Sequence, residues 1–303
     1  MLAFTVNCLA QTTGEGPTQE LKAKDSELRL TLARQALKWD EPAEPFHIAG
    51  PLYYVGTRGL GAYLFATSEG LILLNTGMPE SGPLIAASIS QLGFEPHDIK
   101  LLISGHAHID HVGALAYMKE LSGATLAVME ADVAAMEDGG RSDFQYAADW
   151  EAVGFPPVAV DRVLRDGDRV TLGEVSLTAL ATPGHTRGST TWVTELVDGG
   201  KSYLVVFPDG AGVNPGYRLV KDPSYPGIEG DYRRTHHRLE MLKPDIWALY
   251  HVEAFDIDGK RERAKTEGVA AWVDPEGYRL WVWERKQDFE KAVNVEMGVT
   301  VAE

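Results

Sequence analysis

The sequence predicts an α/β fold made of two similar β-rich halves with helices on the outside. In each half a hairpin pattern precedes a helical pattern: a hairpin at 61–75 precedes a helix at 84–92, and a hairpin at 189–207 precedes a helix at 232–242. No change of composition and no flexible linker separates the halves. Since such elements bury their apolar faces by layering helices on sheets, we expect residues 20–303 to form one domain.

Hydrophobic periodicity places the remaining elements. The segment 99–104, IKLLIS, has the apolar character of a strand that is buried on both faces. Segment 143–155 is expected to be a surface excursion that borders a cleft. By the same criteria, helices are expected at 20–39, 113–121, 131–137 and 277–291, and strands at 52–57, 125–129, 163–164, 169–172, 175–181 and 246–250.

The charge balance argues against two classes of partner. The chain has 303 residues, with 28 Lys and Arg against 44 Asp and Glu, which gives a formal net charge of −16 at pH 7. Such a field repels nucleic acids and anionic lipid surfaces, so we expect neither as a partner. The single cysteine, Cys8, cannot form an internal disulfide, and it excludes zinc sites built on several cysteines.

The first residues allow two interpretations. Residues 1–10 hold a short apolar run, and Cys8-Leu9-Ala10 before Gln11 resembles the cleavage site of a secretory signal, although no basic region leads it. One hypothesis is a signal-peptide remnant on a periplasmic or secreted protein; the other is an ordinary N-terminus, compatible with a cytoplasmic protein. No later stretch reaches the roughly 18 apolar residues that a membrane helix needs.

Three histidines and an aspartate are concentrated in the sequence HAHIDH at 106–111. This H-x-H-x-D-H pattern follows the expected strand at 99–104, and α/β proteins place their sites at such strand ends. Imidazole and carboxylate are the ligands that zinc takes when thiolates are absent. The first two histidines can share one metal, while the aspartate and the third histidine turn to a second. The alternative is a polar surface loop, which the density of histidine disfavours.

Two later histidines occupy similar positions. His185 follows the expected strand at 175–181, and His251 follows the one at 246–250. Either residue alone would more often be a core or capping histidine, but two metals need about three protein ligands each. We therefore expect one metal to be held by His106, His108 and His185, and a second by Asp110, His111 and His251. The remaining histidines, His47, His97, His236 and His237, are expected to be structural.

Together these motifs resemble the metallo-β-lactamase superfamily, whose signature is H-x-H-x-D-H with a downstream P-G-H-T and a late histidine. The resemblance runs from about residue 39 to about residue 283. Within the superfamily, the chain resembles most specifically the third subclass of class B β-lactamases, because several matching stretches carry no metal ligand. The stretches include PFHIAGPLYYVGT, LILLNTG, ATPGHTRGSTTW, GVNPGYRL and DPSYPGIEGDYRR. The other subclasses commonly use a cysteine ligand or an asparagine in the first position, and this chain has neither there.

The resemblance implies a four-layer αβ/βα sandwich and two Zn²⁺ per chain, held by the two groups of ligands given above. It also implies that a hydroxide bridging the metals attacks the β-lactam carbonyl without a covalent intermediate, and that Asp110 is catalytic, binding zinc and orienting the hydroxide. The absence of a G-x-S-x-G serine motif agrees with this. Asn75 and Thr76 are expected to support the ligands, with a turn residue as the alternative for Asn75.

One stretch departs from the family pattern. Members carry G-S-x-S or G-S-x-T before V-N-P-G-Y, and these hydroxyls help to hold the substrate carboxylate; here Gly210 and Gly212 stand in their place and offer backbone N–H groups alone. Asp209 adds a negative charge that opposes a carboxylate, and it either supports the ligands or reaches the metals. Arg218 is expected to pair with the substrate carboxylate, with a solvated surface arginine as the alternative.

The sequence therefore supports three hypotheses of function. The first is a zinc β-lactamase that acts on a small-molecule β-lactam antibiotic. The second is a hydrolase of the same fold that acts on another substrate, such as a lactone, with weak or no β-lactamase activity. The third is a non-enzymatic metal-binding module, which the six-ligand set argues against because structural zinc sites are usually closed and four-coordinate. The oligomeric state stays open, with a monomer expected.

Overall fold

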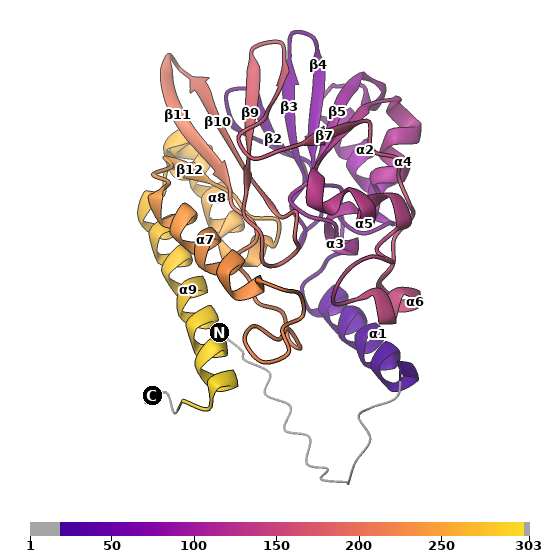
Figure 1. Cartoon of the computed structure of the whole chain (residues 1–303). Helices are drawn as coiled ribbons and strands as arrows, with labels where there is room; N and C mark the ends of the chain where they lie inside the picture. The colour runs from indigo at the N-terminus through magenta and orange to yellow at the C-terminus, as the bar shows by residue number, and fades with distance from the viewer. Residues whose placement is uncertain (1–18, 300–303) are drawn as a thin grey trace.

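Two β-sheets pack face to face, and helices cover both outer faces (Figure 1). The computed structural model describes residues 19–299. This arrangement confirms the expected four-layer αβ/βα sandwich. It allows a central strand to bury one face against the other sheet and the opposite face against helices.

The first sheet has seven strands, which lie side by side in chain order. Strands β1 to β4 pair antiparallel, and β4 to β7 pair parallel. Parallel pairs require crossover connections, and α2 to α6 lie in these crossovers. The strands are β1 (Phe46–Ala49), β2 (Leu52–Tyr54), β3 (Tyr63–Thr67), β4 (Gly70–Leu74), β5 (Ile99–Ile103), β6 (Thr125–Met129) and β7 (Arg162–Leu164).

The second sheet has five strands in the order β12-β11-β10-β9-β8. Strands β8 to β11 form an antiparallel meander, and β12 joins it parallel to β11. The strands are β8 (Arg169–Leu172), β9 (Val175–Ala181), β10 (Thr190–Asp198), β11 (Lys201–Phe207) and β12 (Ile246–Trp247). The expected hairpins at 61–75 and 189–207 are thus confirmed as β3-β4 and β10-β11.

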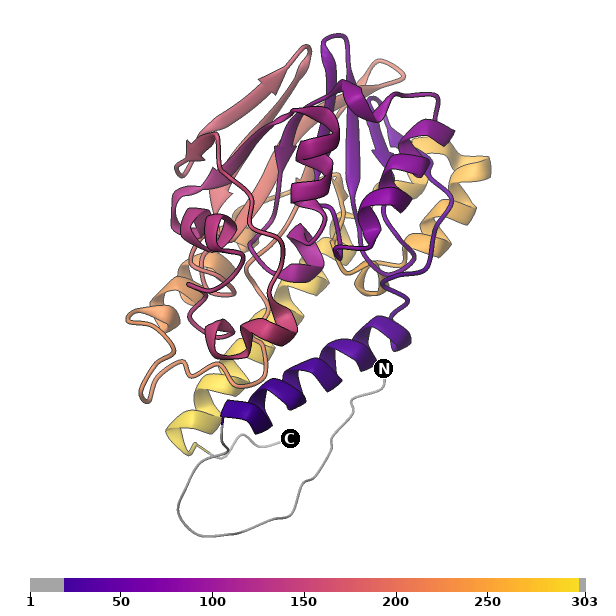
Figure 2. The ribbon, with the colours of Figure 1, turned by 90° about the vertical axis from the view of Figure 1, so that its right-hand side faces the viewer.

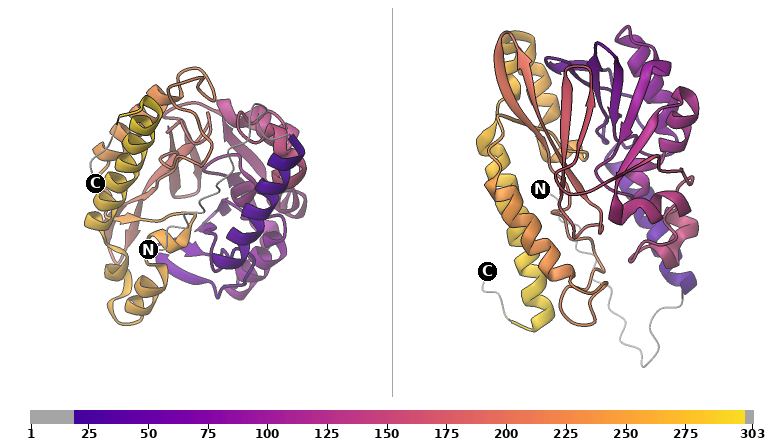
Figure 3. Two further views of the ribbon diagram at one scale, coloured as in Figure 1. Left: turned by 90° about the horizontal axis from the view of Figure 1, so that it is seen from below. Right: turned by 45° about the horizontal axis from the view of Figure 1, so that its top comes forward.

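The helices lie on opposite sides of the sheet pair. Seen from below, α1 lies on one side and α9 on the other (Figure 3). Helix α1 contacts α6 and the 3-10 turn η3 (Ala147–Asp149), and Figure 2 shows it crossing the lower end of the molecule. The helices are α1 (Gln19–Ala36), α2 (Ser81–Gln91), α3 (Ile109–Val112), α4 (Leu115–Ser122), α5 (Val133–Asp138), α6 (Trp150–Val153), α7 (Ile228–Met241), α8 (Ile257–Glu267) and α9 (Pro275–Met297).

Strand β4 shows how the core is divided. Ile72 and Leu74 point to the cluster between the sheets, which Phe207 of β11 also joins. Leu71 and Leu73 point the other way, into a second cluster that includes residues of α2 and α4. Because successive side chains of a strand alternate between faces, an apolar residue is needed at every position here. The same reason accounts for the apolar segment IKLLIS, which is confirmed as the buried strand β5.

The structure differs from the sequence prediction at four elements. Strand β1 and helix α8 were not predicted, because β1 is four residues long and α8, IDGKRERAKTE, lacks an apolar stripe. The helix expected at 113–121 is confirmed as α4, but the one-turn helix α3, which lies within the histidine motif, was not predicted. The strand expected at 246–250 ends at Trp247, after which Tyr250 accepts a hydrogen bond from the Gly61 N–H of the first half.

Two expectations concern the ends of the chain and the membrane. Residues 1–10, the expected signal remnant, lie outside the described residues. Among the helices that the structure describes, none combines the length and the hydropathy that crossing a bilayer demands.

His236 of α7 is a buried histidine away from the expected ligands. Its ring lies 5.3 Å from that of Phe289 and 6.3 Å from that of Tyr232, by ring centroids. Neither ring nitrogen has a hydrogen-bond partner in residues 19–299. Burial, aided by the nearby charge of Lys286, lowers the pKa of His236 to about 4. The folded protein therefore holds this imidazole neutral at pH 7, in a structural position.

This lowered pKa makes stability fall on acidification. The unfolded chain takes up the proton near pH 6.5, so the contribution of neutral His236 to folding is complete above that pH and is lost toward pH 4. Between pH 7.5 and pH 5, we expect the wild type to lose about 2 kcal/mol more unfolding free energy than His236→Phe. Urea titrations of both metal-free proteins measure this difference, in which the shared contribution of the other histidines cancels. Parallel losses in the two proteins would contradict the expectation.

Candidate metal centre

The expected ligand residues meet at one edge of the two sheets. The segment 104–111 follows β5, His185 follows β9, and His251 follows β12. In Figure 1 this is the lower edge of the sheets, where α3 lies. The facing sheets therefore bring residues from both halves of the sequence to one place.

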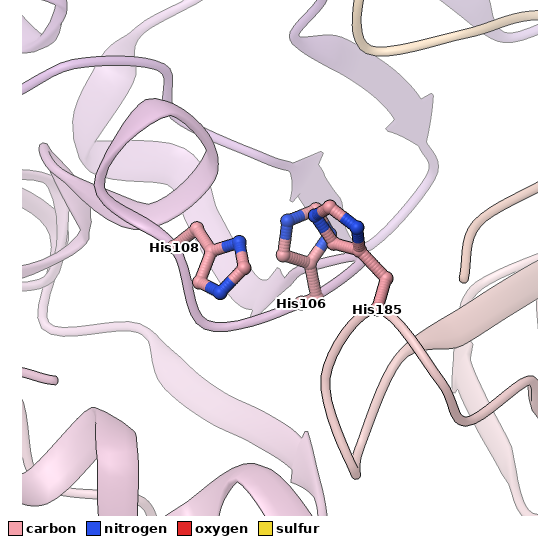
Figure 4. A group of neighbouring side chains, drawn as sticks. All are labelled: His106, His108 and His185. Carbon is pink, nitrogen blue, oxygen red and sulfur yellow. The ribbon is translucent and has the colours of Figure 1, made fainter. Parts of the chain in front are cut away.

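His106, His108 and His185 form the first group. One potential ligand atom of each lies within 4.8 Å of the others, and Figure 4 shows the three imidazoles gathered around a common point. The ring of His106 lies 4.7 Å from that of His108 and 4.5 Å from that of His185, by centroids. His106 is 4% exposed and His108 8% exposed, whereas His185 is partly exposed, so solvent reaches this group mainly at His185.

Each ring of the first group turns one nitrogen toward an oxygen acceptor. The pairs are His106 Nδ1 with Asp209 Oδ2 at 2.9 Å, His185 Nδ1 with the Gly212 carbonyl oxygen at 2.8 Å, and His108 Nε2 with Asp143 Oδ2 at 3.4 Å. A neutral imidazole that donates its one N–H to such an acceptor leaves its other nitrogen unprotonated. The acceptors of His106 and His185 thus select the tautomers that metal binding requires.

Asp110 links a second group. His106, Asp110 and His111 also place potential ligand atoms within 4.8 Å of one another. Oδ2 of Asp110 lies 3.5 Å from Nε2 of His111 and 3.3 Å from Nε2 of His251, whose side chain is 39% exposed. The structure therefore brings all six residues expected as ligands into one cluster.

Asn75 and Thr76 contact the third histidine of the motif. Asn75 is buried with a φ of +63°, a left-handed conformation that asparagine tolerates better than most residues. Its side chain accepts a hydrogen bond from the Gly105 N–H at 2.8 Å and lies 2.8 Å from Nδ1 of His111. The Thr76 N–H donates to the His111 carbonyl oxygen at 2.8 Å. These contacts fix the start of α3 against the end of β4.

Burial controls the charge of the cluster. It lowers the pKa of His106 and His111 well below the usual value and that of His185 to about 3, aided by neighbouring histidine charges. For His251, burial lowers the pKa, but the hydrogen bond and charge of Asp110 outweigh burial and leave the pKa raised. Burial raises the pKa of Asp110, yet the adjacent histidines hold it well below the usual range. At pH 7 the cluster therefore presents neutral imidazoles at His106, His111 and His185 and a carboxylate at Asp110. At His108, burial lowers the pKa, but the hydrogen bond and charge of Asp143 outweigh burial and leave the pKa raised, as at His251.

This donor set fits zinc. Nε2 of His106 and Nε2 of His111 are buried, and in the described part of the chain neither has a hydrogen-bond partner. A buried polar atom without a partner costs about 1–3 kcal/mol, so these nitrogens suit an ion that coordinates them. Neutral imidazole together with carboxylate, in the absence of thiolate, is a set that Zn²⁺ accepts.

A cavity of about 830 Å³ opens onto the cluster. Its apolar walls come from α1 with Trp39 and from the excursion at 143–155, which borders the cleft as expected. Its acidic residues are Asp110, Asp143, Asp149 and Glu253. Among the described residues that line it, Arg29 of α1 is the single Lys or Arg. Substrate thus enters a partly apolar cavity with an excess of carboxylates.

The residues expected to bind substrate lie outside the cavity lining. Gly210 is buried, and its N–H donates to the carboxylate of Asp209. Gly212 lies behind His185, which donates to its carbonyl oxygen. Arg218 is exposed. Asp209 contacts Nδ1 of His106, the nitrogen that faces away from the first group. Of the two roles expected for Asp209, this contact fits support of a ligand.

Sequence reasoning did not find several residues at the site. Asp143 accepts hydrogen bonds from the Gln145 and Tyr146 N–H groups through Oδ1, which leaves Oδ2 toward His108. Tyr146 packs edge-on against that histidine, with centroids 5.2 Å apart. Trp39 lies 5.4 Å from the His251 ring. The only signal was the mixture of aromatic and acidic residues in the excursion, which indicates a lined cleft but not which side chains face it.

Several solved structures align with most of this chain. The FEZ-1 metallo-β-lactamase from Legionella gormanii is 42% identical and has a TM-score of 0.82 over 85% of this chain and 98% of that one. The chain belongs to the metallo-β-lactamase superfamily. The model of the metallo-β-lactamase superfamily matches residues 61–197.

Further solved metallo-β-lactamases support the subclass. BJP-1 of Bradyrhizobium japonicum, a subclass B3 enzyme, is 38% identical with a TM-score of 0.80, over 86% of this chain and 97% of that one. LRA-12 from an Alaskan soil metagenome, a class B3 di-zinc enzyme, is 35% identical with a TM-score of 0.80, over 84% and 96%. The expected likeness to the third subclass of class B β-lactamases is thus confirmed.

Curated sequence relatives in this superfamily carry other activities. The acyl-coenzyme A thioesterase MBLAC2 of Gallus gallus is 35% identical over 102 residues, 29% of this chain and 35% of the relative. A hydroxyacylglutathione hydrolase of Cereibacter sphaeroides is 32% identical over 111 residues, 37% of this chain and 34% of the relative. An N-acyl homoserine lactonase of Bacillus thuringiensis is 35% identical over 74 residues, 17% of this chain and 30% of the relative. The chain spans about a third of the length of these relatives, so superfamily membership alone leaves the substrate open.

The clustering predicts that His185 and His251 each control one metal. Replacing either with alanine should lower zinc content from about two ions per chain to about one and lower the hydrolysis rate with it, because each removal leaves only two of three ligands. Metal analysis after gel filtration measures this. His97→Ala, an exposed histidine outside the site, serves as the control and should keep full zinc content. Full zinc content in the His185 or His251 variant would contradict the assignment of that residue.

Gly210 and Gly212, which stand where the resemblance implies hydroxyl residues, should respond differently to serine. Gly210 has a φ of +81°, and an added Cβ would overlap the Thr182 carbonyl oxygen. A Cβ on Gly212 would meet only His185 Nδ1, at 4.0 Å. We expect Gly210→Ser to lower the free energy of unfolding by about 3 kcal/mol or more and Gly212→Ser to change it by less than about 1 kcal/mol. Urea unfolding compares the two, and equal stability of both variants would refute the steric argument.

Proposed function

We propose that the chain is a zinc-dependent β-lactamase that hydrolyses the β-lactam amide without a covalent intermediate. The observation that supports this most is the likeness to metallo-β-lactamases such as FEZ-1, which covers 98% of that chain at 42% identity. The curated thioesterase match, in contrast, covers 35% of its relative. Similarity over the whole enzyme includes the walls that select substrate, whereas a partial match need only include the metal-binding motif.

The metal chemistry in this proposal follows from the ligand groups. His106, His108 and His185 would hold one Zn²⁺, and Asp110, His111 and His251 a second. Zinc bound there would supply Lewis-acid activation of the attacking water and of the substrate carbonyl.

The protein groups around the ligands have two tasks in the reaction. Asp209 and the Gly212 carbonyl keep the ligating nitrogens of His106 and His185 deprotonated by accepting the hydrogen bond of the other nitrogen. Asp143 places its charge 3.4 Å from Nε2 of His108. Asp110, held ionised by its histidine neighbours, accepts a proton or orients the attacking water. We also propose that residues 20–303 form the catalytic domain and that the protein is periplasmic or secreted.

A second candidate is a hydrolase of the same fold acting on a neutral ester or lactone. The acidic lining of the cavity favours it, because Asp143, Asp149 and Glu253 oppose the carboxylate that β-lactam antibiotics carry. Two of the curated relatives are named as a thioesterase and a lactonase, and both names refer to uncharged acyl bonds. This candidate requires the same zinc ligands, so only substrate turnover separates the two.

Turnover by the purified, zinc-loaded protein tests the proposal. We expect kcat/KM for nitrocefin and imipenem to exceed the value for an acyl homoserine lactone or an acyl thioester by about 100-fold or more, because the proposed site is complementary to the lactam transition state. Removal of zinc with a chelator should abolish the rate, and added zinc should restore it. Asp110→Asn should lower it by at least about 100-fold, which excludes a contaminating enzyme.

The outcomes separate the two functions. Faster opening of the lactone or thioester would replace the first proposal with the second. Full zinc content without turnover of any ester, thioester or amide would leave only a metal-binding module.

A further inference from the structure

A carboxylate outside the ligand cluster joins the two loops that carry the first group of histidines. Asp132 follows β6 at the start of α5 and is 3% exposed. Its Oδ2 accepts hydrogen bonds from the Ala107 N–H at 3.0 Å and from Thr186 Oγ1 at 2.8 Å. Its Oδ1 accepts one from the Gly188 N–H at 2.8 Å. All three donors come from the two loops that hold the histidines.

The positions of the donors connect this carboxylate to the ligands. Ala107 stands between His106 and His108, and Thr186 directly follows His185. The first of these loops follows β5 of the seven-stranded sheet, and the second follows β9 of the five-stranded sheet. The hydrogen bonds of one side chain therefore fix the distance between ligands that belong to different sheets.

The second loop is shaped to approach this carboxylate closely. An added Cβ at Gly188 would lie 2.5 Å from the Asp132 backbone nitrogen and 2.6 Å from its Cγ. Ser189 Oγ lies 2.9 Å from both the Thr186 backbone nitrogen and Thr186 Oγ1, so the hydroxyl that donates to Asp132 is itself held in place. A buried carboxylate needs such donors, since leaving it unpaired is costly.

The other candidate ligands are held separately. His111 is fixed by Asn75 and by the Thr76 N–H at the end of β4. Asp110 lies in α3 and meets His251, which comes from the segment after β12. None of the hydrogen bonds of Asp132 among the described residues goes to these elements.

We propose that Asp132 is a positioning residue that sets the affinity and geometry of the three-histidine metal site, through Ala107 on one loop and Thr186 and Gly188 on the other. The second metal site, on Asp110, His111 and His251, depends on it far less. This inference rests on the proposed metal binding, but not on which substrate the enzyme hydrolyses.

Asp132→Asn tests the inference with little change of shape. An amide offers one acceptor oxygen and an NH₂ donor, so at least one of the three loop donors would face a donor instead of an acceptor. We expect zinc at the three-histidine site to bind about 10- to 100-fold more weakly, with the other site changed much less. Competition against a chromophoric chelator measures both affinities, and the visible spectrum of the Co²⁺-substituted protein reports the geometry of the altered site.

Two further comparisons keep the test decisive. Thr186→Val removes one donor and should weaken the same site, whereas Thr186→Ser keeps the hydroxyl and should restore it; this pair tests the inference even if the Asp132 variant does not fold. Asp245→Asn is the control, because Asp245 also accepts a backbone hydrogen bond between strands, from Leu204 N–H at 2.9 Å, but lies outside the site. It should leave both zinc affinities unchanged.

The possible results assign failure to one proposal or the other. Unchanged affinities in Asp132→Asn and Thr186→Val, or an equal loss at both sites that Asp245→Asn reproduces, would overturn the positioning role. A wild-type protein that binds no zinc would instead overturn the proposed function, on which this inference rests.

Discussion

The site depends on the pairing of histidine ring nitrogens with oxygen acceptors. In the first group of histidines, one nitrogen of each ring faces a fixed oxygen acceptor, and the other faces the centre of the cluster. A histidine can present an unprotonated nitrogen in a chosen direction only if its N–H is satisfied elsewhere. Asp209 and the Gly212 carbonyl perform this for His106 and His185, which come from two different loops. Without these acceptors the two imidazoles could rotate or exchange tautomers, and the cluster would lose its common point.

The fold supplies this pairing because two sheets end at the same edge. Asp209 and Gly212 follow β11 in the second half, while His106, which Asp209 holds, follows β5 in the first. The apolar cluster between the sheets, with Phe65, Trp192 and Phe207 among its buried members, fixes the distance between the halves. Burying side chains of this size contributes about 2–3 kcal/mol each, so the core carries the cost of placing several polar groups out of water. The chemistry therefore relies on packing that lies remote from it in the sequence.

The sequence predicted the ligand cluster better than its surroundings. The motif at 106–111 and the later His185 and His251 follow strands, and strand ends that share an edge can be inferred from periodicity alone. Asp132 and Asp143 could not be inferred in this way, because each acts through backbone N–H groups or a ring nitrogen of a segment distant in sequence. The hydrogen bond from the Gly210 backbone N–H to Asp209 could not be inferred from the sequence either. Motif position indicates which residue types gather, whereas the direction of each hydrogen bond depends on loop conformation.

The walls of the cavity and the metal loops belong to different parts of the chain. Leu30 and Ala33 of α1, with Trp150 of α6, line one side of the space, while the ligands stand on loops anchored in the sheets. Exchanging apolar residues of α1 for larger or smaller ones would reshape the entrance without disturbing any acceptor of the ligating rings. Selectivity and reactivity can thus diverge independently in this molecule, so a lineage could acquire new substrates by drift in its outer helix while its hydrolytic centre stays intact.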